Sequence, residues 1–139
     1  LIRIRERGSF GSGYAELQQE FLPILKLIAN VLNQRDGHFV VAGHTDDIPI
    51  ETQRFRSNWD LSAARAASVV HYFIQEGDVD PERMEIRALA DNEPIVPNDS
   101  WENRAKNRRV EISVLHGNRS AIAGDSPALN VDYVQEPDG

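Results

Sequence analysis

His38-Phe39-Val40-Val41-Ala42-Gly43 is a short apolar run, and a second apolar segment follows it after a loop. A run of this length and character is typical of a strand buried on both faces. The second segment extends from Leu61 to Glu76. It is preceded by Ser57 with Asp60 three residues later, a helix N-cap pattern, and is followed by Gly77, a helix-stop residue. The sequence therefore predicts a buried strand followed by a helix.

The same strand–helix alternation extends toward the N-terminus. Residues 2–7 alternate apolar and charged side chains, which predicts a strand with one wet face. Residues 8–13 have the composition of a loop. Apolar residues then recur every three to four positions between Leu17 and Leu32, the period of a helix. Pro23 lies inside this stripe, and it either starts the main helix or kinks it.

The C-terminal half adds two further strands. Residues 84–90 alternate again, residues 91–98 form a loop with two prolines, and residues 100–107 suit a short helix. Residues 110–114 are the last predicted strand. The element order is therefore βαβαβ(α)β, which predicts an α/β two-layer sandwich with the helices packed on one face of a mixed sheet.

The composition limits the kind of protein. The 139 residues suit one domain, which we place at residues 1–116, and residues 117–139 are expected to be a flexible C-terminal tail. A net charge of −7 argues against nucleic acid as a partner, and the lack of cysteine excludes disulfides and thiol catalysis. Leu1 falls inside an alternating strand, so the chain is expected to be a fragment of a longer protein.

Arg65 is the one charged side chain among the small and apolar residues of the predicted helix 61–76 before Glu76. A partly desolvated guanidinium requires a carboxylate partner, and Asp46 and Asp47 follow the buried strand. This pattern allows two interpretations. The pairing is either a structural ion pair that holds the loop, or a binding site in which Arg65 holds a ligand carboxylate and Asp46 a ligand ammonium group.

The sequence contains no catalytic or metal-binding pattern. His44-Thr45-Asp46-Asp47 places a histidine near two acids, but the other histidines lack ligand spacing, so no metal or other cofactor is expected. The serines have no nucleophile-elbow sequence around them. The basic cluster at 104–109 suits a salt-bridged helix end better than a phosphate site. We therefore expect a protein that is not an enzyme.

Three sequence blocks together resemble the OmpA-like peptidoglycan-binding domain. They are Gly43-His44-Thr45-Asp46, Asn58-Trp59-Asp60-Leu61-Ser62-Ala63-Ala64-Arg65-Ala66 and Asn107-Arg108-Arg109-Val110-Glu111-Ile112. Residues 47–59 and 10–17 are similar to the MotB/PomB branch, the peptidoglycan-anchoring subunit of the flagellar stator. The resemblance covers residues 1–116. It departs from the family pattern at Ala88-Leu89-Ala90-Asp91, where the family carries two glycines, so the path of that loop stays open.

The resemblance implies a binding site for the diaminopimelate residue of the peptidoglycan stem peptide. In the family, the positions of Asp46 and Arg65 contact that residue, and an acid with an arginine suits a group that carries both ammonium and carboxylate. The site residues implied by the three blocks are Thr45, Asp46, Leu61, Arg65, Asn107, Arg108 and Arg109. Which of the two adjacent arginines contacts the ligand is left open.

The resemblance also implies a cellular setting. The expected function is non-catalytic anchoring of a stator B subunit to the cell wall, in the periplasm, as part of an inner-membrane protein whose membrane segment is absent here. The expected partners are peptidoglycan, a second copy in a homodimer, the stator A subunit through that membrane segment, and flagellar basal-body ring proteins. The alternative is a general OmpA/Pal-like outer-membrane anchor, and a cell-wall hydrolase is the rival from another class.

Overall fold

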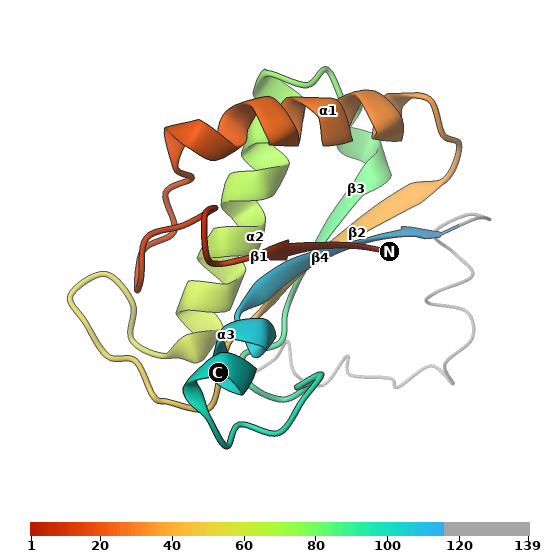
Figure 1. Ribbon diagram of the computed structural model, residues 1–139. Coiled ribbons are helices and arrows are strands. Elements are labelled where there is room, and N and C mark those ends of the chain that lie inside the picture. Colours follow the sequence, from red (N-terminus) through yellow and green to blue (C-terminus); the bar gives the residue numbers. More distant parts are fainter. Residues whose placement is uncertain (116–139) are drawn as a thin grey trace, which may run out of the picture.

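A computed structural model describes residues 1–115 of the chain, so the predicted tail lies outside the described residues. Figure 1 shows a sheet and three helices that pack into a single body. The strands are β1 (Ile2–Arg5), β2 (His38–His44), β3 (Met84–Ala88) and β4 (Arg109–Leu115). The helices are α1 (Leu22–Asn33), α2 (Asn58–Gln75) and α3 (Trp101–Asn107), with short 3₁₀ turns at Gln19–Phe21 and Pro81–Arg83.

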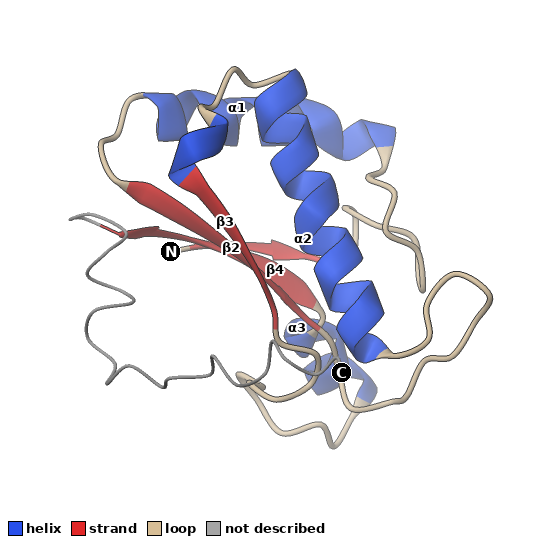
Figure 2. Cartoon of the chain, turned by 180° about the vertical axis from the view of Figure 1, so that it is seen from behind, coloured by secondary structure: helices blue, strands red, loops and turns tan. Residues whose placement is uncertain are grey.

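The sheet is mixed, with the strand order β1-β4-β2-β3. Strands β2 and β3 are parallel, and α2 makes the crossover between them, as a parallel pair requires. Strand β4 lies between β1 and β2 and is antiparallel to both. Figure 2 shows α1 and α2 on the same side of this sheet. The predicted two-layer α/β sandwich is confirmed.

The main core fills the space between the sheet and the two long helices. Its largest fully buried side chains come from β2, β4, α1 and α2: Phe39, Val41, Ile112, Leu25, Leu32, Val69 and Phe73. Phe39 and Val41 alternate along β2 with Val40 and Ala42, which therefore lie on the opposite face of the sheet. No helix within residues 1–115 is long and apolar enough to span a membrane.

Gly43 allows α2 to lie directly against the end of β2. A Cβ atom at this position would come within 2.0 Å of the backbone oxygen of Ser62. Any side chain here would push the helix away from the strand, because real Cβ atoms do not approach backbone oxygens so closely. Gly43 therefore fixes the start of α2 beside the loop that leaves β2, where the predicted site residues lie.

The structure decides the open role of Pro23, and several element boundaries differ from the sequence-based expectation. Pro23 lies in the first turn of α1, so it starts this helix and does not kink it. Leu17 precedes the helix and forms an isolated bridge with Phe10. Strand β3 ends at Ala88, earlier than expected, because Ala90 adopts a left-handed backbone conformation with φ of 51° and directs the chain out of the sheet.

Candidate functional site

A pocket of about 270 Å³ lies beside the loop that leaves β2. It brings together five of the seven predicted site residues, and it excludes Asn107 and Arg109. The five residues are Thr45, Asp46, Leu61, Arg65 and Arg108. The remaining lining comes from the β1–α1 loop, the 48–50 loop, and the first turns of α2 and α3: Glu6, Ser12, Gly13, Ile48, Pro49, Ile50, Asn58 and Trp101. We call this the charged pocket.

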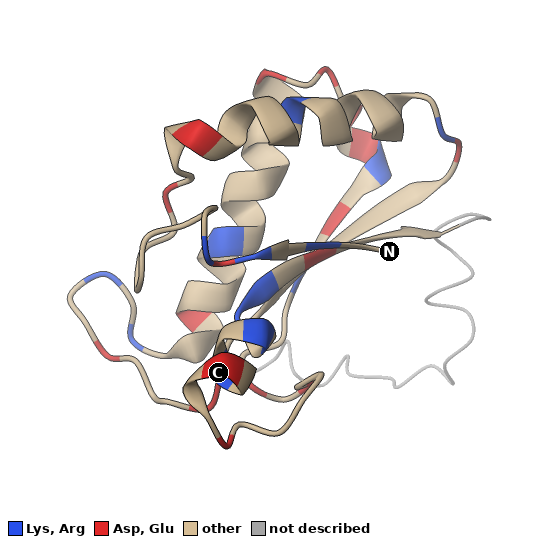
Figure 3. Ribbon diagram, in the orientation of Figure 1, with Lys and Arg blue, Asp and Glu red and all other residues tan. Residues whose placement is uncertain are grey.

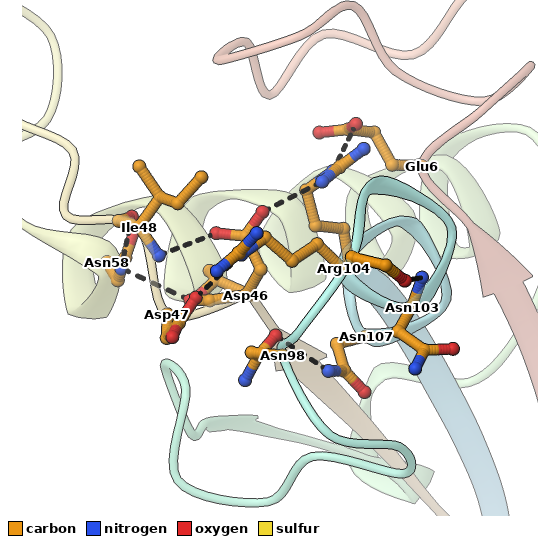
Figure 4. A network of polar contacts seen from close by, with 12 residues as sticks. Glu6, Asp46, Asp47, Ile48, Asn58, Asn98, Asn103, Arg104 and Asn107 are labelled. Atoms are coloured by element: carbon orange, nitrogen blue, oxygen red, sulfur yellow. Dashed lines mark hydrogen bonds and ion pairs between the residues drawn. The ribbon is translucent and has the colours of Figure 1, made fainter.

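Asp46 is held in place by the loop that follows it. Its Oδ1 accepts a hydrogen bond from the backbone N–H of Ile48 at 3.0 Å, and its backbone oxygen accepts one from the Thr45 hydroxyl at 2.8 Å. Asn58 at the start of α2 donates to the backbone oxygen of Ile48 at 3.1 Å (Figure 4). These contacts leave Asp46 Oδ2 directed at a cation, and that cation is Arg108, at 2.8 Å.

The carboxylate partner of Arg65 is Glu6, which corrects the expectation that Asp46 or Asp47 pairs with it. Arg65 Nη1 lies 2.8 Å from Glu6 Oε2, and the side chain of Arg65 is only 2% exposed. The other two guanidinium nitrogens each donate to a backbone oxygen of the β1–α1 loop, with Nε 2.8 Å from Tyr14 and Nη2 3.0 Å from Gly11. Arg65 therefore fastens the β1–α1 loop to α2.

Arg108 connects the two acids of the charged pocket. Its Nε donates to Glu6 Oε1 at 2.7 Å, and its Nη1 donates to Asp46 Oδ2. Burial opposes the charged form of Arg108, but the hydrogen bonds to Asp46 and Glu6 prevail and raise its pKa. The ion pairs therefore form a series of alternating charge, in the order Arg65, Glu6, Arg108 and Asp46. Of its two arginines, Arg108 is the one that solvent reaches, because its side chain is 23% exposed.

One side of the charged pocket is apolar. Leu61 in the first turn of α2 is buried against Phe55, and Ile50 packs on the same small cluster. Ile48 stands over the pocket and is 54% exposed. The pocket therefore offers an anion and a cation on one side and an aliphatic surface on the other.

Asn107 lies outside the charged pocket and organises the loop before α3. It is fully buried, and its Oδ1 accepts hydrogen bonds from the backbone N–H groups of Ile95 and Val96. Its Nδ2 donates to the backbone oxygen of Val96 and to the side chain of Asn98 at 2.8 Å (Figure 4). All of its polar capacity is used by the protein, so its place in the structure is that of a loop anchor.

Arg109 lies on the opposite face of the sheet from the charged pocket. It begins β4 opposite His44 of β2, and its Nε donates to Glu111 Oε2 at 2.7 Å. Although burial opposes it, hydrogen bonds from Arg109 and Arg3 hold the pKa of Glu111 below its ordinary value. Consecutive residues at a strand start point to opposite faces, so Arg108 and Arg109 cannot both reach one ligand.

Glu6 is the pocket residue that sequence reasoning missed. The alternation Ile2, Ile4, Glu6 puts its side chain in phase with the apolar, core-facing residues of β1, and Glu6 is 8% exposed. A carboxylate at a core-facing position of a strand is costly unless a cation pairs with it. The position of Glu6 in the alternation was therefore a sequence signal for a buried cation nearby.

His44 creates an expected pH dependence of stability. Its ring is 2% exposed, and neither nitrogen has a hydrogen-bond partner within residues 1–115. Burial, with the nearby positive charge of Arg109, lowers its pKa, against the opposing effect of Glu111 and Glu93. As the pH falls, His44 therefore binds a proton in the unfolded chain before it does so in the folded domain. Its contribution to the free energy of unfolding is fully present above about pH 6.5 and is lost as the pH drops toward the pKa of His44 in the folded domain.

Urea denaturation between about pH 8 and pH 5 measures this effect. The variant His44→Gln is expected to flatten the pH dependence, and His71→Gln on the exposed side of α2 serves as the matched control that leaves it unchanged. An equally steep loss of stability in His44→Gln would assign the effect to another group.

The fold and the charged pocket define an α/β sandwich domain with one zwitterionic site beside its central strand. The chain belongs to the OmpA family, whose sequence profile matches residues 9–108. It is 34% identical to Motility protein B of Bacillus subtilis (strain 168) over 116 residues, which are 83% of this chain and 44% of that protein. With Motility protein B of Helicobacter pylori (strain J99) it shares 39% identity over 98 residues, 69% of this chain and 38% of that protein.

The chain also resembles solved structures of related domains. The periplasmic domain of Helicobacter pylori MotB superposes with a TM-score of 0.73 at 32% identity, covering 89% of this chain and 88% of that one. The cell wall anchor of the T6SS from Pseudomonas aeruginosa superposes with a TM-score of 0.77 at 41% identity, covering 83% and 80%. The chain spans less than half the length of the two motility proteins, so it corresponds to one part of them.

Proposed function

We propose that this domain binds peptidoglycan without cleaving it, through the diaminopimelate residue of the stem peptide. The observation that carries the proposal is the adjacency of Asp46 and Arg108 in the charged pocket, with 2.8 Å between their charged groups. A group that carries an ammonium and a carboxylate on one carbon is complementary to this pair in charge. Membership in the OmpA family and the relation to a cell wall anchor support the same ligand.

On binding, the ligand is expected to replace the ion pair between Asp46 and Arg108 with two ion pairs of its own. Its ammonium group takes the place of Arg108 beside Asp46, and its carboxylate takes the place of Asp46 beside Arg108. A ligand with only one of the two charges would leave a pocket charge unpaired, which is costly in a partly buried site. Arg65 lines the pocket, but each of its three guanidinium nitrogens already contacts Glu6 or the β1–α1 loop, so we propose that Arg65 supports the site.

The cellular role that we propose is anchoring of a flagellar stator B subunit to the cell wall. The Motility protein B relatives and the MotB periplasmic structures support this role. It places the domain in the periplasm and implies an inner-membrane segment that joins it to the stator A subunit, with basal-body ring proteins within reach. The alternative, a general OmpA/Pal-like anchor, is favoured by the T6SS anchor and by Outer membrane protein A of Bordetella avium, 36% identical over 100 residues.

Cosedimentation with purified sacculi tests the proposed function. The domain is expected to pellet with sacculi that contain diaminopimelate and to stay in solution with sacculi that contain lysine at the same position, because lysine lacks the second carboxylate. Analysis of the supernatant separates the anchor from a hydrolase, since only a hydrolase releases soluble muropeptides. Equal pelleting with both kinds of sacculi would contradict recognition by the charged pocket.

We further propose that the domain works as a homodimer, because two linked sites hold the cell wall about 10² to 10⁴ times more tightly than one. The exposed side chains Ile24, Leu27 and Val31 follow one side of α1 and offer an apolar interface. Analytical ultracentrifugation across a concentration series is expected to show a reversible monomer–dimer equilibrium. A single monomeric species at the highest concentration would contradict dimerisation through this domain.

A further inference from the structure

A second pocket of about 570 Å³ adjoins the charged pocket, on the side of α3 and the β1–α1 loop. Four residues line both pockets: Glu6, Ser12, Trp101 and Arg108. The second pocket adds the polar side chains of Arg7, Gln18 and Glu102. The two pockets therefore form one continuous surface along which a ligand beside Asp46 and Arg108 can extend.

Trp101 stands on the border of the two pockets. It is the first residue of α3, and it is 81% exposed. Its backbone is fixed, because the Ser100 side chain caps the helix by accepting from the N–H of Asn103 at 3.1 Å, and the other end of α3 is held by the buried Asn107. A large aromatic ring is thus presented to solvent on a rigid support, beside a site that already holds opposite charges.

We propose that Trp101 stacks on a sugar ring of the glycan strand whose stem peptide occupies the charged pocket. The face of an indole ring is electronegative, and the C–H bonds on the face of a pyranose ring carry partial positive charge, so the two surfaces attract. Arg7 and Gln18 supply hydrogen-bond donors for the hydroxyl and acetamido groups of N-acetylated sugars.

The reach of the stem peptide agrees with this placement. Two residues separate diaminopimelate from the lactyl group of N-acetylmuramic acid, and two extended residues span at most about 7 Å. The sugar therefore stays close to the diaminopimelate residue, and the second pocket adjoins the charged pocket that holds this residue. The inference rests on the proposed function, because the sugar is positioned by the peptide in the charged pocket.

Binding of two ligands, one without and one with the sugars, distinguishes the contribution of the sugar contact from that of the peptide contact. One is the tetrapeptide L-Ala-γ-D-Glu-meso-diaminopimelyl-D-Ala, and the other is the same tetrapeptide attached to N-acetylglucosaminyl-N-acetylmuramic acid. Calorimetric titration of Trp101→Ala is expected to show roughly a threefold to tenfold weaker affinity for the disaccharide peptide than the unaltered domain, the size of one aromatic stacking contact. Affinity for the free tetrapeptide is expected to fall by a clearly smaller factor, because Trp101 also lines the charged pocket but contributes no charge to it.

Trp59→Ala is the matched control, since Trp59 is also exposed, at 53%, and lines neither of the two pockets. It is expected to bind both ligands like the unaltered domain. An equal loss of both ligands in Trp101→Ala, or no loss of either, would overturn the sugar contact and leave the proposed function standing. Failure of the unaltered domain to bind the tetrapeptide would overturn the proposed function together with this inference.

Discussion

Replacement of Arg65 by alanine is expected to lower the free energy of unfolding by about 3–5 kcal/mol, the cost of breaking a buried ion pair from one side. The variant leaves the Glu6 carboxylate with one cation fewer, and it removes the donors to the backbone oxygens of Gly11 and Tyr14. The guanidinium also lies over the ring of Phe10, 5.0 Å from its centroid, and this contact is lost as well. Urea denaturation measures the change.

Arg54→Ala is the control for this variant. Arg54 forms an ion pair of similar length with Glu16, at 2.7 Å, but both side chains are more than half exposed. An exposed pair contributes at most about 1 kcal/mol, so the control is expected to unfold nearly like the unaltered domain. If Arg65→Ala were as stable as this control, the interpretation that Arg65 holds the β1–α1 loop against α2 would be wrong.

Replacement of Asp46 by asparagine is expected to weaken binding to diaminopimelate-containing sacculi by about tenfold to a hundredfold, the contribution of one hydrogen bond to a charged group. Asparagine keeps an oxygen that accepts from the N–H of Ile48, so the loop conformation is retained. It removes the negative charge that faces the ligand ammonium group. The amount of domain that pellets with sacculi measures this loss.

Asp47→Asn tests whether the effect belongs to the charged pocket or to negative charge in general. Asp47 is the next residue, its side chain is 43% exposed, and it pairs with Arg104 at 3.0 Å outside the charged pocket. Its replacement is expected to leave pelleting unchanged. A loss of similar size in both variants would indicate that overall charge, and not the pocket, governs attraction to the cell wall (Figure 3 shows acidic and basic residues interspersed along the chain).

The sequence predicted the fold because its periodicities are local. The alternation in residues 2–5, the apolar run at 38–43 and the cap at Ser57 each specify one element, and the order of elements leaves a two-layer mixed sandwich as the natural arrangement. Element ends were less predictable. Ala90, two residues after β3, adopts a left-handed conformation that alanine rarely adopts, and its one signal was the resemblance, because the family carries two glycines in this stretch.

The candidate site was predictable in its position but not in its pairing. The lone arginine of α2 and Asp46 after β2 line the same pocket, yet the carboxylate partner of Arg65 is Glu6, 59 positions away in the chain. Arg108 and Arg109 are chemically identical and adjacent, so they point to opposite faces, and only the register of β4 against β2 decides which of them faces the charged pocket. Contacts of this kind follow from tertiary structure, which residue spacing does not encode.

Titration of the isotope-labelled domain with the meso-diaminopimelate tetrapeptide, followed by amide chemical shifts, locates the ligand directly. We predict that the largest shifts cluster around the charged pocket, at Thr45, Asp46, Leu61 and Arg108, and that Asp46→Asn needs about ten to a hundred times more peptide to reach them. Shifts centred on the opposite face of the sheet, near Val40 and Ser113, or no shifts at millimolar peptide, would contradict recognition of peptidoglycan by this pocket.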